Sequence, residues 1–124
     1  PYTELVEELT LTEFLNFHFS FKSLKEGMNI KEVITKSRLE GNEKKFVKHF
    51  SSGMKQRLKL SLGIYSSSPI LLLDEPTTNL DKENKKWYFE EITAILKNKT
   101  VVIASNTPEE YTFAEDFIKI ENYK

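Results

Sequence analysis

The chain has 124 residues, of which 39% are hydrophobic and 12% aromatic, enough for one packed domain or for part of a larger one. Its 18 basic and 19 acidic residues leave a formal net charge of −1, which argues against a general nucleic-acid or anionic-membrane binder, because such proteins normally carry a basic excess. Without cysteine, without 18 consecutive apolar residues and without a start like a signal peptide, the chain is expected to be soluble and intracellular.

The first predicted helix begins with a capping box, in which the Thr10 hydroxyl and the Glu13 carboxylate satisfy backbone amides reciprocally. Apolar residues then recur at helical spacing: Leu11, Phe14, Leu15 and Phe19. A second helix is expected from about Ile30 to Lys36, and Gly41-Asn42 separates it from the next element.

A third helix is predicted to begin at Ser51-Ser52-Gly53 and to end at the serine-rich stretch before Pro69. Its apolar residues lie three or four apart: Met54, Leu58, Leu62 and Tyr65. Basic residues alternate with core leucines here, so we interpret them as a solvated helix face rather than a nucleic-acid stripe.

The second half alternates between strands and helices. The apolar run 70–73 predicts a strand buried on both faces of a parallel sheet, and 101–104 predicts a second such strand. Asp81 suits the N-cap of an intervening helix to about Leu96, whose buried side is expected to be Tyr88, Ile92, Ile95 and Leu96. Pro108 suits the first turn of a short helix, and residues 117–120 are expected to be a last strand. This order implies right-handed crossovers and a parallel sheet.

Two adjacent carboxylates, Asp74 and Glu75, come directly after the first predicted strand. A carboxylate at the C-terminal end of a buried strand points into the crevice where open α/β sheets bind ligands. Neighbouring residues there face different ways, so one can reach a metal while the other reaches a water. Two solvated acids after a core strand are the alternative interpretation, which the adjoining segment 76–81, PTTNLD, makes less favoured.

The turn Ser51-Ser52-Gly53 is the second chemical feature. Serine hydroxyls and free amides at a helix N-terminus form an anion site, and Gly53 lets the backbone approach a ligand closely. An ordinary serine N-cap is the alternative. Gln56-Arg57, together with the distance of about twenty residues to Asp74, favours the anion site.

Taken together, residues 51–81 resemble the signature motif, Walker B motif and D-loop of an ABC-type ATPase, in that family's order and spacing. The resemblance implies an α/β fold: a P-loop NTPase-like partial parallel sheet with an α-helical subdomain on the N-terminal side. Residues 1–68 would be the helical subdomain ending in the signature-motif helix. Residues 69–124 would be the C-terminal part of the RecA-like ATPase core. The segment 9–15 resembles the start of the helical subdomain, near which the membrane subunit docks.

The resemblance also implies site residues. Asp74 matches the residue that holds Mg²⁺, usually through water, and Glu75 matches the catalytic residue that polarises the attacking water. Asn106 takes the place of the histidine that senses the γ-phosphate, and is assigned to catalysis. The residues assigned to nucleotide binding are Ser51, Ser52, Gly53, Met54 and Asp81.

Three positions depart from the family pattern. Ser52 replaces a glycine and Met54 replaces a glutamine, which implies a variant contact with the γ-phosphate. Asn106 can donate a hydrogen bond but cannot carry a positive charge. Neither His18 nor His49 stands at a suitable place to substitute for the histidine, and both are expected at the surface or between helices.

A phosphate-binding loop of the form Gly-x-x-x-x-Gly-Lys-Ser/Thr cannot be formed from the four glycines, which are Gly27, Gly41, Gly53 and Gly63. We therefore expect the chain to be a C-terminal portion of an ATPase domain and to be inactive alone, without tight ATP binding. A sheet cut in half leaves an edge and an apolar face uncovered, which favours self-association.

For the full protein, the resemblance implies the ATP-binding and ATP-hydrolysing subunit of an ABC transporter. It would use ATP and Mg²⁺, pair head-to-tail with a second ATPase domain, and bind transmembrane transporter subunits as a cytoplasmic protein at the inner face of the cell membrane. No nucleic-acid partner is expected.

Two alternative functions stay open. The first is a soluble ABC protein acting on ribosomes or DNA. Against it, the sequence contains no long basic arm, no coiled-coil heptads and no second ATPase cassette. A non-catalytic interaction module is favoured by Asn106 and the missing loop, and opposed by the pair Asp74-Glu75.

Overall fold

The computed structural model describes residues 4–116. Its elements, in chain order, are α1 (Leu11–Phe21), α2 (Ile30–Lys36), the 3₁₀ turn η1 (Val47–His49), α3 (Ser52–Ile64), β1 (Ile70–Asp74), α4 (Lys82–Ile95), β2 (Thr100–Ala104) and the 3₁₀ turn η2 (Pro108–Tyr111). The predicted helices and the first two predicted strands are confirmed. The predicted last strand, residues 117–120, lies outside the described residues.

Local capping decides where the helices begin. At α1 the Thr10 amide donates to the Glu13 carboxylate at 2.9 Å and the Glu13 amide donates to the Thr10 hydroxyl at 3.2 Å, which confirms the predicted capping box. Asn29 caps α2, since its side-chain oxygen accepts from the Glu32 amide at 2.9 Å.

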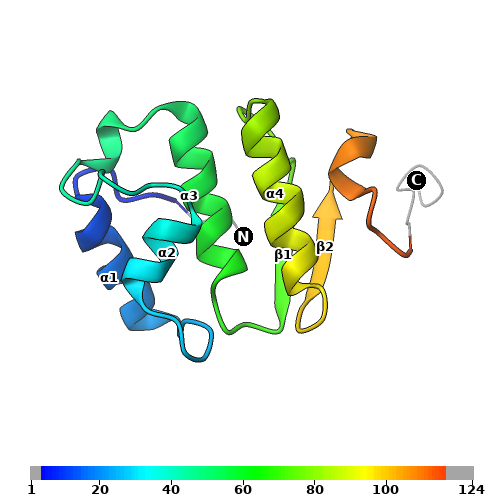
Figure 1. Ribbon diagram of the computed structural model, residues 1–124, viewed down its shortest axis with the longest axis horizontal. Helices are drawn as coiled ribbons and strands as arrows, with labels where there is room; N and C mark the ends of the chain where they lie inside the picture. The colour runs from blue at the N-terminus through cyan, green and yellow to red at the C-terminus, as the bar shows by residue number, and fades with distance from the viewer. Residues whose placement is uncertain (1–3, 117–124) are drawn as a thin grey trace.

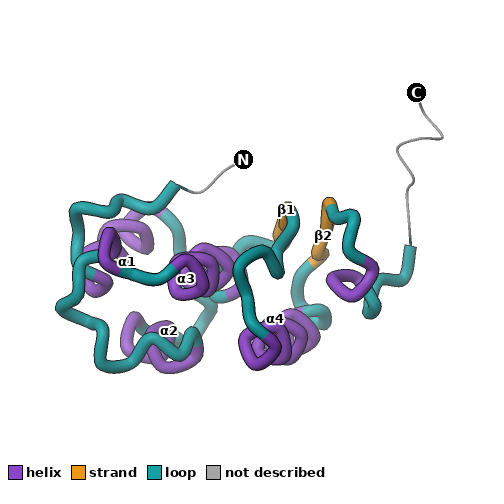
Figure 2. The backbone as a smooth tube through the Cα atoms, turned by 90° about the horizontal axis from the view of Figure 1, so that it is seen from above, coloured by secondary structure: helices purple, strands orange, loops and turns teal. Residues whose placement is uncertain are grey.

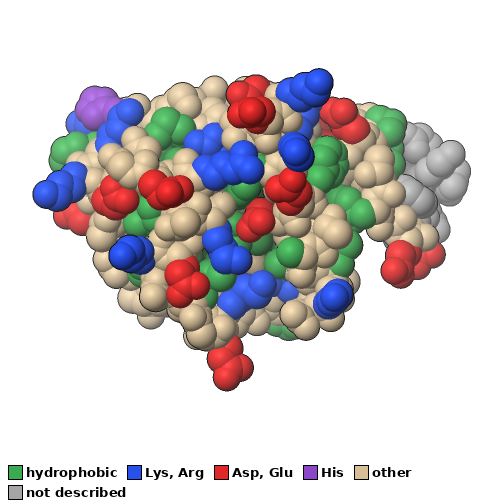
Figure 3. Space-filling view, in the orientation of Figure 1, with side chains coloured by type: hydrophobic (Ala, Val, Ile, Leu, Met, Phe, Trp, Pro, Cys, Tyr) green, Lys and Arg blue, Asp and Glu red, His purple; other side chains and the backbone are tan. Residues whose placement is uncertain are grey.

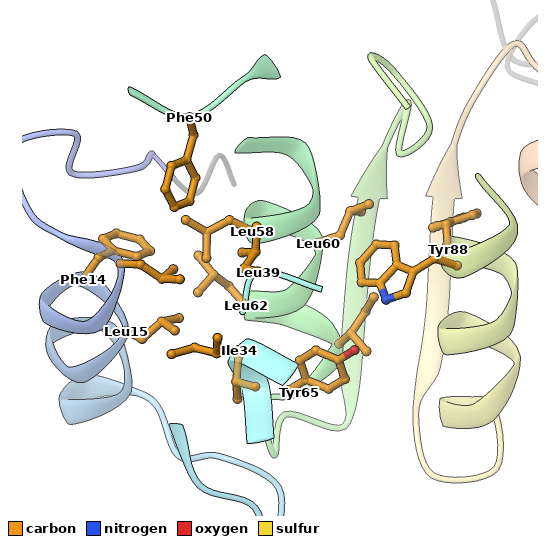
Figure 4. Close-up of a cluster of buried hydrophobic side chains, with 14 of the residues drawn as sticks. Phe14, Leu15, Ile34, Leu39, Phe50, Leu58, Leu60, Leu62, Tyr65 and Tyr88 are labelled. Carbon is orange, nitrogen blue, oxygen red and sulfur yellow. The ribbon is translucent and has the colours of Figure 1, made fainter. Parts of the chain in front are cut away.

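Helices α1, α2 and α3 enclose an apolar core (Figure 1). The side chains that meet in it come from all three helices and from the loops between them (Figure 4): Phe14, Leu15, Ile34, Leu39, Phe50, Leu58 and Leu62. Each of them is buried, and for those on the helices this is what the helical spacing of the apolar residues requires.

The helical part and the sheet are joined by close packing and side-chain hydrogen bonds. A Cβ on Gly63 would lie 2.3 Å from Cδ1 of Leu71, so the Leu71 side chain of β1 packs directly against the backbone of α3. The Trp87 Nε1–H of α4 donates to the Lys36 carbonyl at the end of α2, at 2.7 Å. The Tyr65 hydroxyl donates to the Glu91 carboxylate at 2.5 Å.

The two strands pair in parallel, from Ile70 opposite Thr100 to Asp74 opposite Ala104. Helix α4 makes the crossover between them and covers one face of the sheet, while no described element lies on the other face (Figure 2). Both strands end at the same edge, which is where the site is built.

The prediction that both strands are buried on both faces of the sheet is wrong for the described residues. Ile70, Leu72 and Val102 are 56%, 57% and 52% exposed, whereas Leu71 is 7% exposed. Side chains alternate between the two faces of a sheet, and a single covering helix buries only one of them. The expected uncovered apolar face is therefore present. The predicted burial of Leu96 is also wrong, because this residue lies beyond the last turn of α4 and is 37% exposed.

The surface shown in Figure 3 intermixes acidic and basic side chains, as the balanced composition requires. Within residues 4–116, no helix combines the length and apolarity needed to cross a membrane.

Candidate functional site

The candidate site lies at the carboxyl ends of β1 and β2, where three segments meet. These segments are the turn 75–81 after β1, the segment 105–107 after β2, and the N-terminus of α3. Hydrogen bonds and close backbone contacts join all three segments. The structure thus gathers residues that lie as far as 55 positions apart in the chain, from Ser51 to Asn106.

Glu75 turns sharply away from the direction of β1. Its φ angle is +45°, and its amide donates to the Ala104 carbonyl at 2.9 Å. Its carboxylate Oε1 accepts from the Asn106 backbone amide at 3.1 Å. A left-handed backbone costs a residue with a Cβ about 1–2 kcal/mol, which these two hydrogen bonds help to offset. The carboxylate of Glu75 is therefore held beside the segment after β2.

Asp74 ends β1 and its side chain is exposed. In the part of the chain that the structure describes, no hydrogen bond or ion pair occupies its carboxylate, and no cluster of three His, Asp or Glu residues could hold a metal ion. Mg²⁺ commonly binds through one or two carboxylates while keeping waters and phosphate oxygens as its other ligands. The exposed carboxylate of Asp74 fits that mode.

The N-terminus of α3 is capped by Ser51, whose hydroxyl oxygen accepts from the Met54 amide at 3.1 Å. Two contacts attach this helix to the turn after Glu75. A Cβ on Gly53 would lie 3.2 Å from the Asn79 carbonyl oxygen. The Gln56 side-chain amide donates to the Pro76 carbonyl at 2.9 Å. Residues 51–54 and the turn after β1 thus form one surface, with Ser51 and Ser52 exposed on it.

Asp81 caps α4, because its carboxylate accepts from the Asn84 amide at 2.9 Å. Burial lowers the pKa of Arg57, and the negative charge of Asp81 acts in the opposite direction. The Arg57 Nε–H donates to the Ser37 carbonyl at 3.2 Å. Arg57 therefore connects the end of α2 with the region where α4 begins.

Asn106 is exposed and lies just after β2, as predicted. Its backbone amide is the group that contacts Glu75. The preceding Ser105 shapes this segment, since its hydroxyl oxygen accepts from the Thr107 amide at 2.9 Å.

Glu110 is a further residue of this region, and it is absent from the residues predicted from the sequence. It is only 1% exposed although it carries a carboxylate. Its Oε1 accepts from the Thr77 amide at 2.9 Å and from the Thr77 hydroxyl, and its Oε2 accepts from the Ser105 hydroxyl. Tyr88 of α4 donates its hydroxyl to the Glu110 carbonyl at 3.2 Å. An acidic residue in the turn after Pro108 resembles an ordinary solvated charge, so no local pattern could have identified it.

Comparison with known proteins gives consistent results. The family model described as "ABC transporter" matches residues 2–78, more than half of the chain. ABC transporter A family member 7 of Dictyostelium discoideum is 29% identical over 119 residues, and ABC transporter A family member 4 of the same organism is 32% identical over 126 residues. These matches cover 94% and 97% of this chain, but only 14% and 8% of the two relatives.

Among solved structures, a dimeric, post-hydrolysis form of the ATP-binding cassette MJ0796, bound to ADP and Pi, superposes with a TM-score of 0.74 at 22% sequence identity. The match covers 89% of this chain and 51% of the cassette. The described helices and parallel strands therefore have the fold of an ABC ATPase cassette, over about half of such a cassette.

Proposed function

Because the chain belongs to the ABC transporter family, we propose that it is the C-terminal part of an ATP-hydrolysing domain that powers transmembrane transport. Residues 1–68 form the helical subdomain, and residues 69–124 form the C-terminal part of the ATPase core. The observation that carries the proposal is the position of Glu75, whose carboxylate is held at the end of β1 by the Asn106 amide, 3.1 Å away. Phosphoryl transfer needs such a fixed group beside the attacking water.

In this proposal Glu75 polarises the attacking water. Its carboxylate has a second oxygen that takes part in no hydrogen bond within residues 4–116, so it can accept the proton of a water. The side-chain amide of Asn106, exposed beside it, donates to the γ-phosphate. Asp74 holds Mg²⁺, which when bound neutralises charge on the phosphates.

The surface formed by Ser51, Ser52, Gly53 and Met54 contacts the γ-phosphate of ATP on a second ATPase domain. Serine hydroxyls and helix amides suit an anion, although Ser51 also caps its own helix. We assign Asp81, the N-cap of α4, to nucleotide binding as well. The dimeric state of the solved cassette supports pairing with a second ATPase domain, and we propose that the two domains pair head-to-tail. In this proposal the ATPase domains bind transmembrane transporter subunits at the cytoplasmic face of a membrane.

The test is the substitution Glu75→Gln in the longer protein that contains this chain. It keeps size and hydrogen bonding but removes the negative charge, so ATP turnover is expected to fall roughly 10²–10⁴-fold, the usual scale for losing general-base help. ATP binding is expected to persist, with ATP-bound dimers accumulating in size-exclusion chromatography. Hydrolysis by the variant at the parental rate would contradict the proposal.

A non-catalytic interaction module is the second candidate function, and Asn106 in the place of a histidine favours it. The same assay separates the two candidates. A module of this kind would show no ATP hydrolysis before or after the Glu75→Gln substitution, while its dimerisation would not depend on ATP.

A further inference from the structure

We propose that Glu110 is a positioning residue, whose buried carboxylate holds the turn after β1 and the segment after β2 in one fixed arrangement. This inference rests on the proposed function of Glu75, because the arrangement matters for hydrolysis only if Glu75 acts on the water. Glu110 itself lies in η2 and touches neither Glu75 nor Asn106 by any hydrogen bond that the described residues show.

The two carboxylate oxygens of Glu110 bind different segments. Oε1 takes both donors of Thr77, the amide at 2.9 Å and the hydroxyl, while Oε2 takes the Ser105 hydroxyl. Thr77 lies two residues after Glu75, and Ser105 lies one residue before Asn106. One buried carboxylate therefore bridges the two segments that carry the candidate catalytic residues.

These contacts close a ring. From Glu75 the chain runs to Thr77, crosses through Glu110 to Ser105, continues to Asn106, and returns through the 3.1 Å hydrogen bond between the Asn106 amide and the Glu75 carboxylate. A ring constrains both of its sides, so opening it at Glu110 removes one of the links between the turn and the segment after β2, and leaves the hydrogen bond from the Glu75 amide to the Ala104 carbonyl in place. The Glu75 carboxylate would then lose its defined position.

The chemistry of the converging groups explains why a carboxylate stands at position 110. Three donors converge on it, and an ionised carboxylate is acceptor-only, so it can satisfy all three. Burial strengthens such charge-assisted hydrogen bonds. A glutamine could keep the ring, because its amide group can donate to the Ser105 hydroxyl oxygen while that hydroxyl turns to the Thr107 carbonyl, 3.2 Å away. An alanine could not.

The first experiment measures amide hydrogen exchange in the 124-residue chain, without nucleotide. Glu110→Ala and Ser105→Ala are expected to speed exchange of the Asn106 amide about tenfold, the equivalent of one lost hydrogen bond. Glu110→Gln is expected to restore the slow exchange. The matched control is Ser37→Ala, which removes the hydroxyl of a buried serine that donates to the Ile34 carbonyl far from the ring, and is expected to leave Asn106 unaffected.

The second experiment measures steady-state ATP hydrolysis in the longer protein. Glu110→Ala and Ser105→Ala are expected to lower kcat roughly 10–100-fold, the scale for a misplaced catalytic group, while KM for ATP stays near its parental value. Glu110→Gln is expected to recover most of the lost kcat. In a Glu75→Gln background, Glu110→Ala is expected to have no further effect, because the two residues act on one step.

The outcomes separate the two proposals. If the parental protein does not hydrolyse ATP, the proposed function fails and the exchange measurement alone decides the positioning role. If Glu110→Ala does not fold, Ser105→Ala carries both experiments. The positioning role is overturned if the Asn106 amide exchanges at the parental rate in both Ser105→Ala and Glu110→Ala. It is also overturned if the losses of kcat from Glu75→Gln and Glu110→Ala multiply in the double variant.

Discussion

Asn106 stands where the family resemblance places a histidine, and the structure gives it two separate groups to use. Its backbone amide is engaged with Glu75, so the backbone contribution is independent of the side chain. Its exposed side-chain amide stays able to donate to a phosphate oxygen, without a charge that depends on pH. Substitutions at this position therefore test the side chain alone.

In the longer protein, Asn106→Ala is expected to slow ATP hydrolysis, because a donor to the γ-phosphate is lost. The loss is expected to be roughly tenfold, the scale of one hydrogen bond to a charged group. Asn106→His is expected to preserve or raise the rate, since it restores the usual family side chain. Steady-state ATPase rates for both variants decide the matter. Equal rates in all three proteins would leave Asn106 as a turn residue only.

His18 gives the chain a dependence of stability on pH. Burial lowers the pKa of its imidazole below the ordinary 6.5, and the positive charge of Lys22 lowers it further. The unfolded chain therefore binds a proton at His18 more readily than the folded chain does. Its contribution to stability is complete above pH 6.5 and is lost as the pH falls below that value.

We therefore expect the free energy of unfolding to decrease between about pH 7 and pH 5, and His18→Gln to make that decrease shallower. Urea unfolding followed by circular dichroism at several pH values measures both slopes. Comparison at about pH 8, where His18 is neutral in the folded and unfolded chains, separates the packing cost of the substitution from the titration. Identical slopes for the two proteins would show that His18 does not contribute.

At the scale of elements, Lys99 joins the end of α3 to the start of the sheet. It is 8% exposed, and its ammonium group donates to the carbonyls of Gly63, Ser66 and Ser68 at 3.2, 2.5 and 2.8 Å. A helix leaves its last carbonyls without partners, and a cation there satisfies them. Burial lowers the pKa of Lys99, and the positive charge of Lys25 lowers it further, but hydrogen bonds to the carbonyls stabilise the charged form.

Lys99→Met is expected to lower the free energy of unfolding by about 1–3 kcal/mol, since it removes the ammonium group that donates to the Ser66 and Ser68 carbonyls while preserving side-chain volume. Lys97→Met is the matched control, because Lys97 is two residues away and exposed. Urea unfolding midpoints of the two variants give the comparison. A loss for Lys97→Met as large as for Lys99→Met would contradict the role of the carbonyl contacts.

At the scale of the whole molecule, the uncovered face of the sheet exposes apolar side chains to solvent. Ile70, Leu72 and Val102 expose more than half of their area, and no described element covers the face of the sheet opposite α4 (Figure 2). Contiguous exposed apolar residues on strands favour association between copies. The 124-residue chain is therefore expected to self-associate through this face.

Leu72→Thr is expected to weaken that association roughly tenfold, because a leucine side chain contributes about 1.5–3 kcal/mol when fully buried and threonine suits a strand. Phe21→Ser is the control, since Phe21 is 76% exposed but lies on α1, away from the sheet. Sedimentation equilibrium measures the association constants. A monomeric parental chain at high concentration, or an equal effect of Phe21→Ser, would contradict the role of the sheet face.

Local sequence patterns were sufficient for the elements and for the order of the motifs. The caps Thr10, Ser51 and Asp81 act on amides three residues away, and helical spacing involves neighbours three or four apart, so both are visible in the printed sequence. The positions of Asp74 and Glu75 at a strand end come from the same kind of local pattern. The meeting of Glu75 with the segment of Asn106 results from the pairing of β1 with β2, because parallel strands end at one edge.

Only the tertiary structure decided which polar residues are buried and which apolar residues are not. Glu110 and Lys99 are of residue types that usually lie at the surface, yet each is buried against partners more than 30 positions away. The left-handed turn at Glu75 and the exposure of Leu72 likewise depend on segments that are remote in sequence. The physical reason is that desolvation and hydrogen bonding of a side chain depend on what the fold places around it, which the spacing of neighbouring residues does not specify.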